Sequence, residues 1–185
     1  MRKWLLLAVA LAVLLAGWRP APKEPEGLGL VRVLGVDGAG PVTLTAVCGG
    51  DDQGDQDRGW YTGEDFAQAL EGLPWSGQKE LSLTSVSYII VGRDVELKEI
   101  LLAVLRNEEL GASATVWLAE EGAVELLNCC YDPASGLDLL ARRGIEAPTV
   151  VEALAALEHG EVLTLPLLAG DVPVLIDWEE WRGLA

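Results

Sequence analysis

Residues 94–119 read DVELKEILLAVLRNEELGASATVWLA, and this stretch decides the fold class. In its first half, apolar side chains recur at the spacing of a helix that buries one face; they are Leu97, Ile100, Leu101, Val104 and Leu105. We expect Asp94 to cap this helix. The second half ends in a short apolar run, Ala114–Ala119, which predicts a strand containing Trp117.

The segments before this stretch predict further strands. Leu28–Val36 and Val42–Val47 are rich in valine and leucine and flank a glycine-rich turn, which predicts a hairpin. Residues 81–90 alternate as a strand does, but the phase slips between Leu83 and Val86. That slip predicts either a bulge or burial on both faces of one strand.

A polar loop and a short helix are predicted between these strands. Residues 49–59 are polar and rich in glycine, which is typical of a loop. Thr62 is expected to open a short helix, with Asp65 three residues later as a weak capping box. The apolar residues that share one face of this helix are Phe66, Ala69 and Leu70.

The C-terminal half predicts three helices and two closing strands. The helices are Gly122–Leu127, a segment marked by Leu137, Leu140 and Ala141 that Gly144 closes, and Thr149–His159 with a Thr149/Glu152 capping box. The strands are Val162–Leu168 and Val172–Ile176. Because strands and helices mix without strict alternation, the expected fold is α/β (α+β), a mixed β-sheet with flanking helices.

The N-terminus predicts a targeting segment. Met1-Arg2-Lys3 is basic, and residues 4–16 form an unbroken apolar run. At about 1.5 Å per residue this run spans about 20 Å, which is less than the roughly 30 Å hydrocarbon core of a bilayer. We therefore expect an N-terminal apolar helix within residues 1–18, either a signal peptide or an uncleaved membrane anchor. Residues 19–27 contain three prolines and predict an extended spacer, so the folded domain is expected to comprise residues 28–185.

The charge of the chain argues against two classes of partner. Asp and Glu number 29 against 13 Lys and Arg, and the net charge is −16. Nucleic acid requires clustered Lys and Arg against its phosphates, so no nucleic-acid partner is expected. The same excess argues against binding of the folded part to an anionic bilayer surface.

Residue types that carry chemistry are few in this sequence. The single histidine, His159, falls in the last turn of a predicted helix, where a polar or cationic side chain suits the helix dipole. The three cysteines are Cys48, Cys129 and Cys130; a disulfide from Cys48 to one of the other two and three separate thiols both stay open. The patterns of a nucleophile elbow, a phosphate-binding loop and a Cys-x-x-Cys pair do not occur.

The remaining polar and aromatic clusters are interpreted as structural. The acidic loop does not match a calcium-binding loop and is expected to be solvated; it holds Asp51, Asp52, Asp55 and Asp57. The adjacent pairs Glu120-Glu121 and Glu179-Glu180 are expected on the solvated surface. We expect Trp178 and Trp181 to anchor the C-terminus on the domain, although they suit a partner surface as well. The sequence therefore predicts no catalytic residue, no cofactor-binding residue and no metal ligand.

The order of five segments resembles the first domain of the Ger(x)C spore germination proteins. Those proteins have a strand that ends in a Leu-Gly-Ile-Asp-like turn, then a polar loop, a helix, a strand and an amphipathic helix. The resembling segments here are Val33–Asp37, Glu64–Leu70, Leu81–Gly92, Leu105–Leu110 leading to Thr115–Ala119, and Ala153–Leu157 leading to Leu165–Leu168.

The resemblance implies a non-enzymatic subunit of a nutrient-germinant receptor at the spore inner membrane. Such a subunit is expected on the extracytoplasmic face, beside integral-membrane receptor subunits, and without a cofactor. The chain departs from the family at Ala16-Gly17-Trp18, where the lipidated cysteine is absent, and at Thr84-Ser85, where the family has Gly-His. Lipid anchoring is therefore not expected at that place, and association with the membrane would depend on the N-terminal segment.

Two functions of other classes are compatible with the same sequence. An exported α/β enzyme of unknown substrate would be consistent with the fold class and the many carboxylates. A structural envelope protein would be held by its own uncleaved N-terminal helix.

Overall fold

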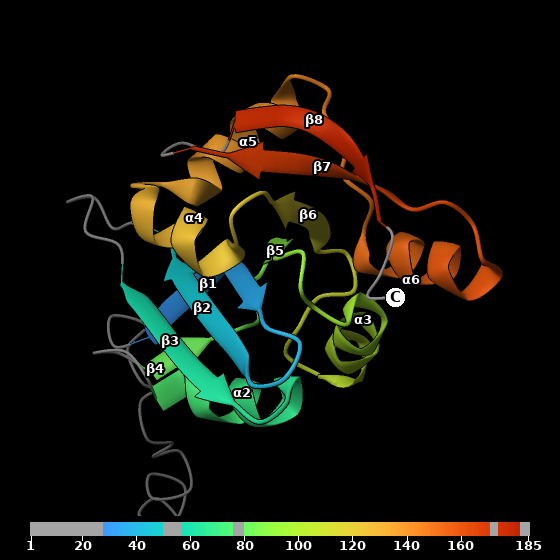
Figure 1. Cartoon of the computed structure of the whole chain (residues 1–185). Coiled ribbons are helices and arrows are strands. Elements are labelled where there is room, and N and C mark those ends of the chain that lie inside the picture. The colour runs from blue at the N-terminus through green and yellow to red at the C-terminus, as the bar shows by residue number, and fades with distance from the viewer. Residues whose placement is uncertain (1–27, 50–56, 76–79, 171–173, 182–185) are drawn as a thin grey trace, which may run out of the picture.

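The computed structural model describes residues 28–49, 57–75, 80–170 and 174–181. Within these ranges eight strands form one mixed sheet, with helices packed on both faces (Figure 1). This confirms the predicted fold class. The apolar segment and the spacer predicted for residues 1–18 and 19–27 lie outside the described residues. Among the residues that are described, no helix is both long enough and apolar enough to cross a membrane.

The sheet is parallel at its centre and antiparallel at its two ends. Its order is β3-β2-β1-β5-β6-β7-β8, and β4 also pairs with β1. The parallel strands are β1 (Leu28–Asp37), β4 (Glu80–Ser82), β5 (Tyr88–Val91), β6 (Thr115–Ala119) and β7 (Thr164–Ala169). The antiparallel strands are β2 (Val42–Cys48), β3 (Arg58–Gly63) and β8 (Val174–Glu180).

The helices divide between the two faces of the sheet. On one face lie α2 (Phe66–Gly72), the short 3-10 helix η2 (Leu73–Trp75), α3 (Leu97–Arg106) and α6 (Val150–His159). On the other lie α4 (Ala123–Cys129) and α5 (Pro133–Arg142). Each face has its own apolar core, because alternate residues of the buried strands point to opposite sides. Val36 of β1 thus packs on the side of α3, and Val33 packs on the side of α4 and α5.

The predicted N-terminal hairpin is confirmed, whereas the loop predicted after it is too long. β1 and β2 pair antiparallel in the predicted places. Residues 58–59, predicted as loop, begin β3, which pairs with Val42–Val47 of β2. Thr62 lies in β3 and does not open a helix. Asp65 is itself the N-cap of α2, and its carboxylate accepts the Gln68 N–H at 2.8 Å.

The strand predicted for residues 81–90 is two strands. β4 lies beside Leu28–Leu30 and β5 lies beside Val33–Val36, both on the same edge of β1. A turn at residues 84–85 separates them. The slip in the apolar alternation marks this break, which the sequence did not distinguish from a bulge.

Helix α3 buries the predicted face with two differences. Leu97, Ile100, Leu101 and Val104 are buried, while Leu105 is 38% exposed at the margin of that face. The N-cap is Glu96, and no side chain caps the helix. Asp94 does not cap α3, because its Oδ1 accepts the Gly38 N–H at 3.3 Å from the β1–β2 turn.

The three C-terminal helices form close to the predicted boundaries, whereas β7 and β8 each begin two residues later than predicted and β8 continues four residues further, to Glu180. Thr149 and Glu152 form the predicted capping box at the start of α6, and Gly160 ends the helix with φ +67°. The helix marked by Leu137 begins earlier than its apolar residues indicate, because Asp132 caps it through the Ser135 N–H.

A polar contact on the sheet holds α5 in place. The Tyr88 hydroxyl donates to Asp138 Oδ1, and Arg32 Nη2 lies 3.4 Å from the same oxygen. Burial, followed by the hydrogen bond to Asp138, raises the pKa of Tyr88 to about 12. The contact joins β1, β5 and α5.

Candidate functional site

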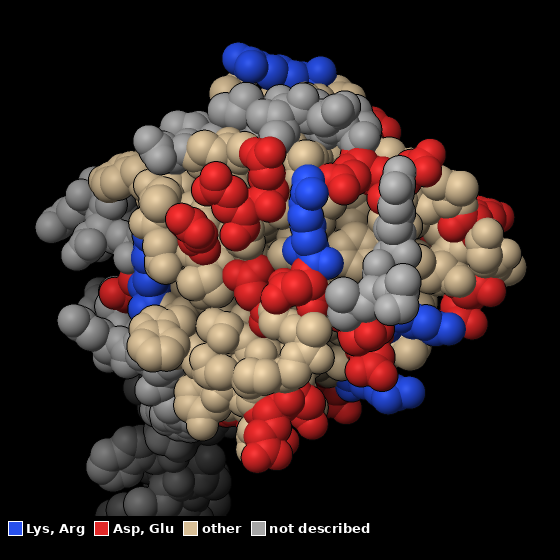
Figure 2. All heavy atoms as spheres, viewed as in Figure 1, with Lys and Arg blue, Asp and Glu red and all other residues tan. Residues whose placement is uncertain are grey.

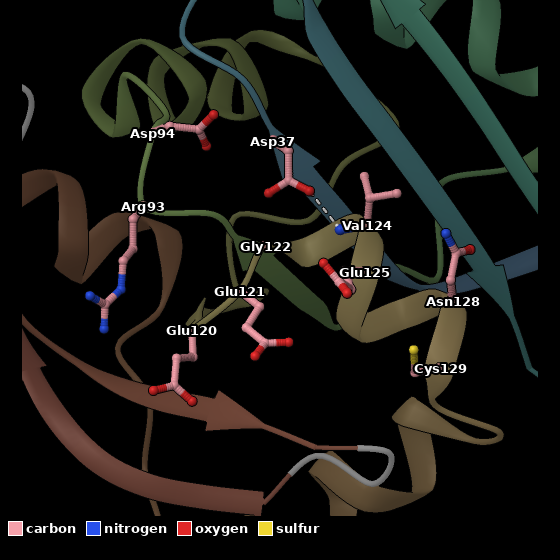
Figure 3. Close-up of a pocket in the computed structure, with 10 residues that line it drawn as sticks. All are labelled: Asp37, Arg93, Asp94, Glu120, Glu121, Gly122, Val124, Glu125, Asn128 and Cys129. Atoms are coloured by element: carbon pink, nitrogen blue, oxygen red, sulfur yellow. Dashed lines mark hydrogen bonds between the residues drawn. The ribbon is translucent and has the colours of Figure 1, made fainter.

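A cavity of about 600 Å³ opens at the carboxyl ends of the parallel strands β1, β5 and β6 (Figure 3). In open α/β sheets, ligands bind at this edge. The cavity is lined by Asp37, Arg93, Asp94, Glu120, Glu121, Gly122, Val124, Glu125, Asn128 and Cys129. Its position makes it the candidate site among the described residues.

Asp37 is the last residue of β1 and binds the start of α4. One carboxylate oxygen accepts the Ala123 N–H at 2.8 Å, and the other accepts the Val124 N–H at 2.6 Å. The first backbone N–H groups of a helix have no partner within the helix, so Asp37 supplies two of the missing acceptors. Both carboxylate oxygens of Asp37 are therefore engaged in holding the fold.

Two glycines make room for this carboxylate. A Cβ added at Gly92, directly after β5, would overlap Asp37 Oδ1 and come within 3.0 Å of Asp94 Oδ1. Gly122 has φ +121°, a backbone conformation that other residues rarely adopt, and a Cβ there would lie 3.5 Å from both Asp37 oxygens. Asp37 and Asp94 can therefore lie near one another at the sheet edge because Gly92 carries no side chain.

The neighbourhood of Asp37 sets its ionisation. Burial raises the pKa of the Asp37 carboxyl above its ordinary value of 3.8. The N–H groups of Val124 and Ala123 oppose this rise because they stabilise the charged form, while the carboxylate of Asp94 adds to it. The Asp37 carboxyl therefore takes up a proton more readily in the folded chain than in water.

Acidic side chains dominate the cavity wall. Five carboxylates line it, and Arg93 is its single lining cation. Figure 2 shows acidic side chains gathered around the hollow on this face, with a basic side chain among them. Arg93 is engaged by an acidic residue of β8, since its Nη2 lies 2.6 Å from Glu179 Oε2. The site thus presents negative charge to whatever enters it.

The chemical equipment of the cavity is limited. Cys129 contributes an exposed thiol, but the single histidine of the chain, His159, is an exposed residue at the end of α6 and does not line the cavity. A cysteine nucleophile is activated by an adjacent base or by a cationic neighbour. In the described ranges, no three His, Cys, Asp or Glu side chains are placed to hold a metal ion.

The structural roles expected for several residues can be compared with their positions. His159 lies in the last turn of α6, as predicted. Among the cysteines, Cys48 and Cys130 are buried and Cys129 is exposed. Trp181 packs against the core, as expected for a C-terminal anchor, and its backbone N–H donates to the backbone carbonyl of Leu163 at 2.7 Å. The side chain of Trp178 lies outside the described residues, as do Asp51, Asp52 and Asp55 of the acidic loop.

The adjacent pairs Glu120-Glu121 and Glu179-Glu180, both predicted on the solvated surface, lie in different surroundings. Glu120 and Glu121 are exposed, as predicted, but they also line the same cavity as Asp37 and Asp94. Glu179 forms the ion pair with Arg93, so it is not a purely solvated residue. The sequence interpretation missed this convergence. The signal that would have indicated it is the position of Asp37, Asp94 and Glu120, because each lies at the end of a strand or shortly after it.

Comparison with known proteins found no match. Neither a protein-family model, nor a curated protein, nor a solved structure is significantly similar to this chain.

Proposed function

We propose that this protein is a non-enzymatic subunit of a spore germinant receptor. In this proposal it resides on the extracytoplasmic face of the spore inner membrane and assembles with integral-membrane receptor subunits. The N-terminal apolar segment would associate it with the membrane, since the family's lipidated cysteine is absent at Ala16-Gly17-Trp18.

The observation that carries the proposal is where the resembling segments lie. They fall on one connected part of the sheet and on the helices of one face: the end of β1, then α2, β4 with β5, the end of α3 with β6, and α6 with β7. The order of these segments along the chain, together with their positions on strands and helices of one domain, supports a shared domain architecture.

The roles of the motif residues also favour an architectural function. In the segment Val33–Asp37, a Cβ added at Gly35 would overlap the Leu127 side chain of α4, and Asp37 binds the first turn of that helix. Both residues therefore position α4 on the sheet. Residues with such roles suit a scaffold that presents surfaces to other subunits.

The proposal is tested with spores that carry or lack the gene. We expect germinant-triggered release of dipicolinic acid to slow or stop without the gene and to return with the wild-type gene. Leu105→Asp should also restore release, whereas Leu101→Asp should not, because only the second change places a charge in the core. Unchanged release over a broad nutrient panel, together with failure to co-purify with any polytopic membrane protein, would overturn the proposal.

One observation favours a second candidate, an exported α/β enzyme or small-molecule binder. The acidic cavity lies at the sheet edge where α/β proteins bind ligands, and it contains a carboxyl, Asp37, whose pKa is raised. The double variant Glu120→Gln, Glu121→Gln separates the two candidates. Both side chains are exposed, so the fold should persist. With a receptor scaffold, spores that carry this variant should release dipicolinic acid as wild-type spores do. If release is lost while the variant stays folded, the protein acts through the cavity.

A further inference from the structure

A groove of about 400 Å³ lies between helices α2 and α3, on the face of the sheet opposite α4. Its apolar lining comes from both helices, from η2 and from the residue after β4; the residues are Phe66, Leu70, Pro74, Leu83 and Ala103. Phe66, Leu70 and Leu83 belong to the core and form the apolar floor of this α2–α3 groove. A concave apolar surface of this size suits a short apolar or proline-rich segment.

The two helices that border the α2–α3 groove contribute opposite charges. Glu71 lines it from α2 and Arg106 lines it from the end of α3, and both side chains are exposed. Among the described residues, neither of these two side chains has an ion-pair partner. Glu109 lines the groove from the segment after α3. An occupant with a positive side chain on one edge and a negative side chain on the other would match both helices.

The described chain begins close to the α2–α3 groove. Leu28 pairs with Glu80 of β4, and Leu83, three residues further along, lines the groove. Strands are about 4.8 Å apart and rise about 3.3 Å per residue, so Leu28 lies roughly 11 Å from Leu83. The eight residues 19–26 would extend about 25 Å as a polyproline II helix. They can therefore reach the groove after a reversal at Gly27, which has no side chain to oppose a turn.

We propose that residues 19–26 bind in the α2–α3 groove of their own chain. They read Arg-Pro-Ala-Pro-Lys-Glu-Pro-Glu, and a polyproline II helix has three residues per turn. Pro22 and Pro25 share one edge of such a helix and pack on the apolar floor, where Phe66 supplies an aromatic ring. Because prolines restrict the unbound segment, little conformational freedom is lost on binding.

The charges of the segment fit the two borders of the groove. With Pro22 and Pro25 on the floor, Lys23 and Glu24 lie on the two remaining edges of the polyproline II helix. Lys23 then faces Glu71 of α2, and Glu24 faces Arg106 of α3. Each contact is an exposed ion pair and contributes little by itself, so the pairs set the direction of the segment more than its affinity.

Binding of this kind would determine which side of the domain lies nearest the N-terminal apolar segment. A free spacer would let the domain turn in any direction, whereas a bound spacer would hold the side of α2 and α3 next to that segment. The inference does not depend on the proposed function. It applies equally to a chain that keeps residues 1–18 and to a chain cleaved at the end of them.

Crosslinking within the full-length chain in detergent tests the proposal. Cys129→Ser first removes the exposed thiol, since the other two cysteines are buried. Ala21→Cys is then combined with either Ala67→Cys in the groove or Ala155→Cys on α6. Both of these alanines are exposed on helices of the same face, so they are matched. We expect a short bis-maleimide to join residues 21 and 67 at least about tenfold faster than residues 21 and 155, because binding raises the effective concentration at the groove.

Charge reversal in the chain that joins residues 21 and 67 tests how the groove recognises the segment. Glu71→Lys together with Arg106→Glu should slow the crosslinking about threefold, because both ion pairs become repulsive. Adding Lys23→Glu and Glu24→Lys should restore the rate, because the two ion pairs form again with their signs exchanged. All four side chains are charged and none belongs to the core, so the fold should persist.

Three results would overturn the proposal. Equal crosslinking of Ala67→Cys and Ala155→Cys would show that the segment is not held in the groove, which would leave the groove to lipid or to a partner protein. A product of twice the chain mass as the main species would show that the segment binds a second copy. An unchanged rate after the charge reversal would show that the groove does not recognise Lys23 and Glu24.

Discussion

Asp37 and Arg58 bind opposite ends of the same helix. The Asp37 carboxylate accepts N–H groups at the start of α4, and the Arg58 guanidinium donates to carbonyl groups at its end, with Nη1 2.7 Å from Leu127 O. The negative side chain is at the positive end of the helix dipole and the positive side chain is at the negative end. Because α4 has seven residues and is too short to be stable alone, its place on the sheet depends on these contacts.

Replacing Asp37 should destabilise the domain. We expect Asp37→Ala to lower the free energy of unfolding by about 1–2 kcal/mol, because two N–H groups of α4 lose their acceptors. Asp37→Asn should cost less, since its amide oxygen still accepts one N–H. Urea titration followed by circular dichroism measures both. Glu121→Gln in the same cavity is the control and should lie within about 0.5 kcal/mol of wild type; equal midpoints for all four chains would contradict the role given to Asp37.

The pKa of Asp37 predicts a dependence on pH. Since this pKa is raised in the folded state, the folded chain binds the proton more readily than the unfolded chain. The resulting stabilisation is fully present below the ordinary value of 3.8 and is lost as pH rises through the folded-state pKa. The advantage of wild type over Asp37→Asn should therefore be larger at about pH 4 than at about pH 7. Parallel unfolding curves at both pH values measure it, and a smaller advantage in acid would reverse the sign.

Arg58 should be replaceable by lysine only in part. Its guanidinium also lies 3.1 Å from Asn128 O and 2.5 Å from Cys130 O, so it contacts several carbonyl groups at once. We expect Arg58→Ala to lower the free energy of unfolding by about 1.5–3 kcal/mol. Arg58→Lys should cost less, because lysine keeps a positive charge and N–H donors. It should still cost something, because an ammonium group lacks the planar fork that contacts several carbonyl groups at once. The free energy of unfolding in urea provides the test. If lysine restored full stability, charge alone would account for the contact.

Tyr88→Phe should reveal the polar contact beneath α5. We expect a loss of about 1 kcal/mol at neutral pH, because Asp138 loses the hydroxyl donor but keeps Arg32 nearby. The folded-state pKa of Tyr88 is raised from 10.0 to about 12, so the stability that its neutral form contributes is present below 10.0 and lost between these values. The difference between the two chains should shrink over that range. A difference that grew in alkali would show that the phenolate is stabilised.

The best-defined helix offers a matched pair of charge substitutions. Leu101 is fully buried on α3 and Leu105 is 38% exposed four residues later. Leu101→Asp should cost several kcal/mol and abolish cooperative unfolding, because it places an unpaired charge in the core. Leu105→Asp should unfold cooperatively near the wild-type midpoint. Thermal denaturation followed by calorimetry distinguishes them, and similar midpoints would show that the buried face is assigned wrongly.

Elements with a strong local pattern were predictable, and elements set by distant contacts were not. The apolar spacing of α3 and the capping box of α6 are properties of short segments, so both helices were anticipated. β3 was missed because its glycines and polar neighbours resemble a loop, and its conformation follows from pairing with β2. The spacing of Thr62 and Asp65 resembles a capping box, so the helix was predicted to begin at Thr62. Thr62 lies in β3 instead, and the helix begins after its N-cap, Asp65.

The candidate site was harder to anticipate than the fold. Asp37, Asp94 and Glu120 come together only because β1, β5 and β6 are neighbours in the sheet. The sequence predicted the strands but not their order, and strands that are far apart in the chain can be arranged in many ways. The sequence interpretation therefore placed Glu120 on the solvated surface without seeing the cavity that it lines.

The position of β1 inside the sheet, between β2 and β5, has a consequence for folding during synthesis. The ribosome releases β1 and β2 first, and this hairpin can close early. The parallel neighbour of β1, strand β5, is synthesised only after β3, α2 and β4. Helix α4, which covers one face of β1 and β2, is synthesised later still. Until then, the valines and leucines of the nascent hairpin stay open to water. Such non-local pairing slows folding and exposes apolar strands, so the nascent chain should be a client for chaperones until α4 has emerged.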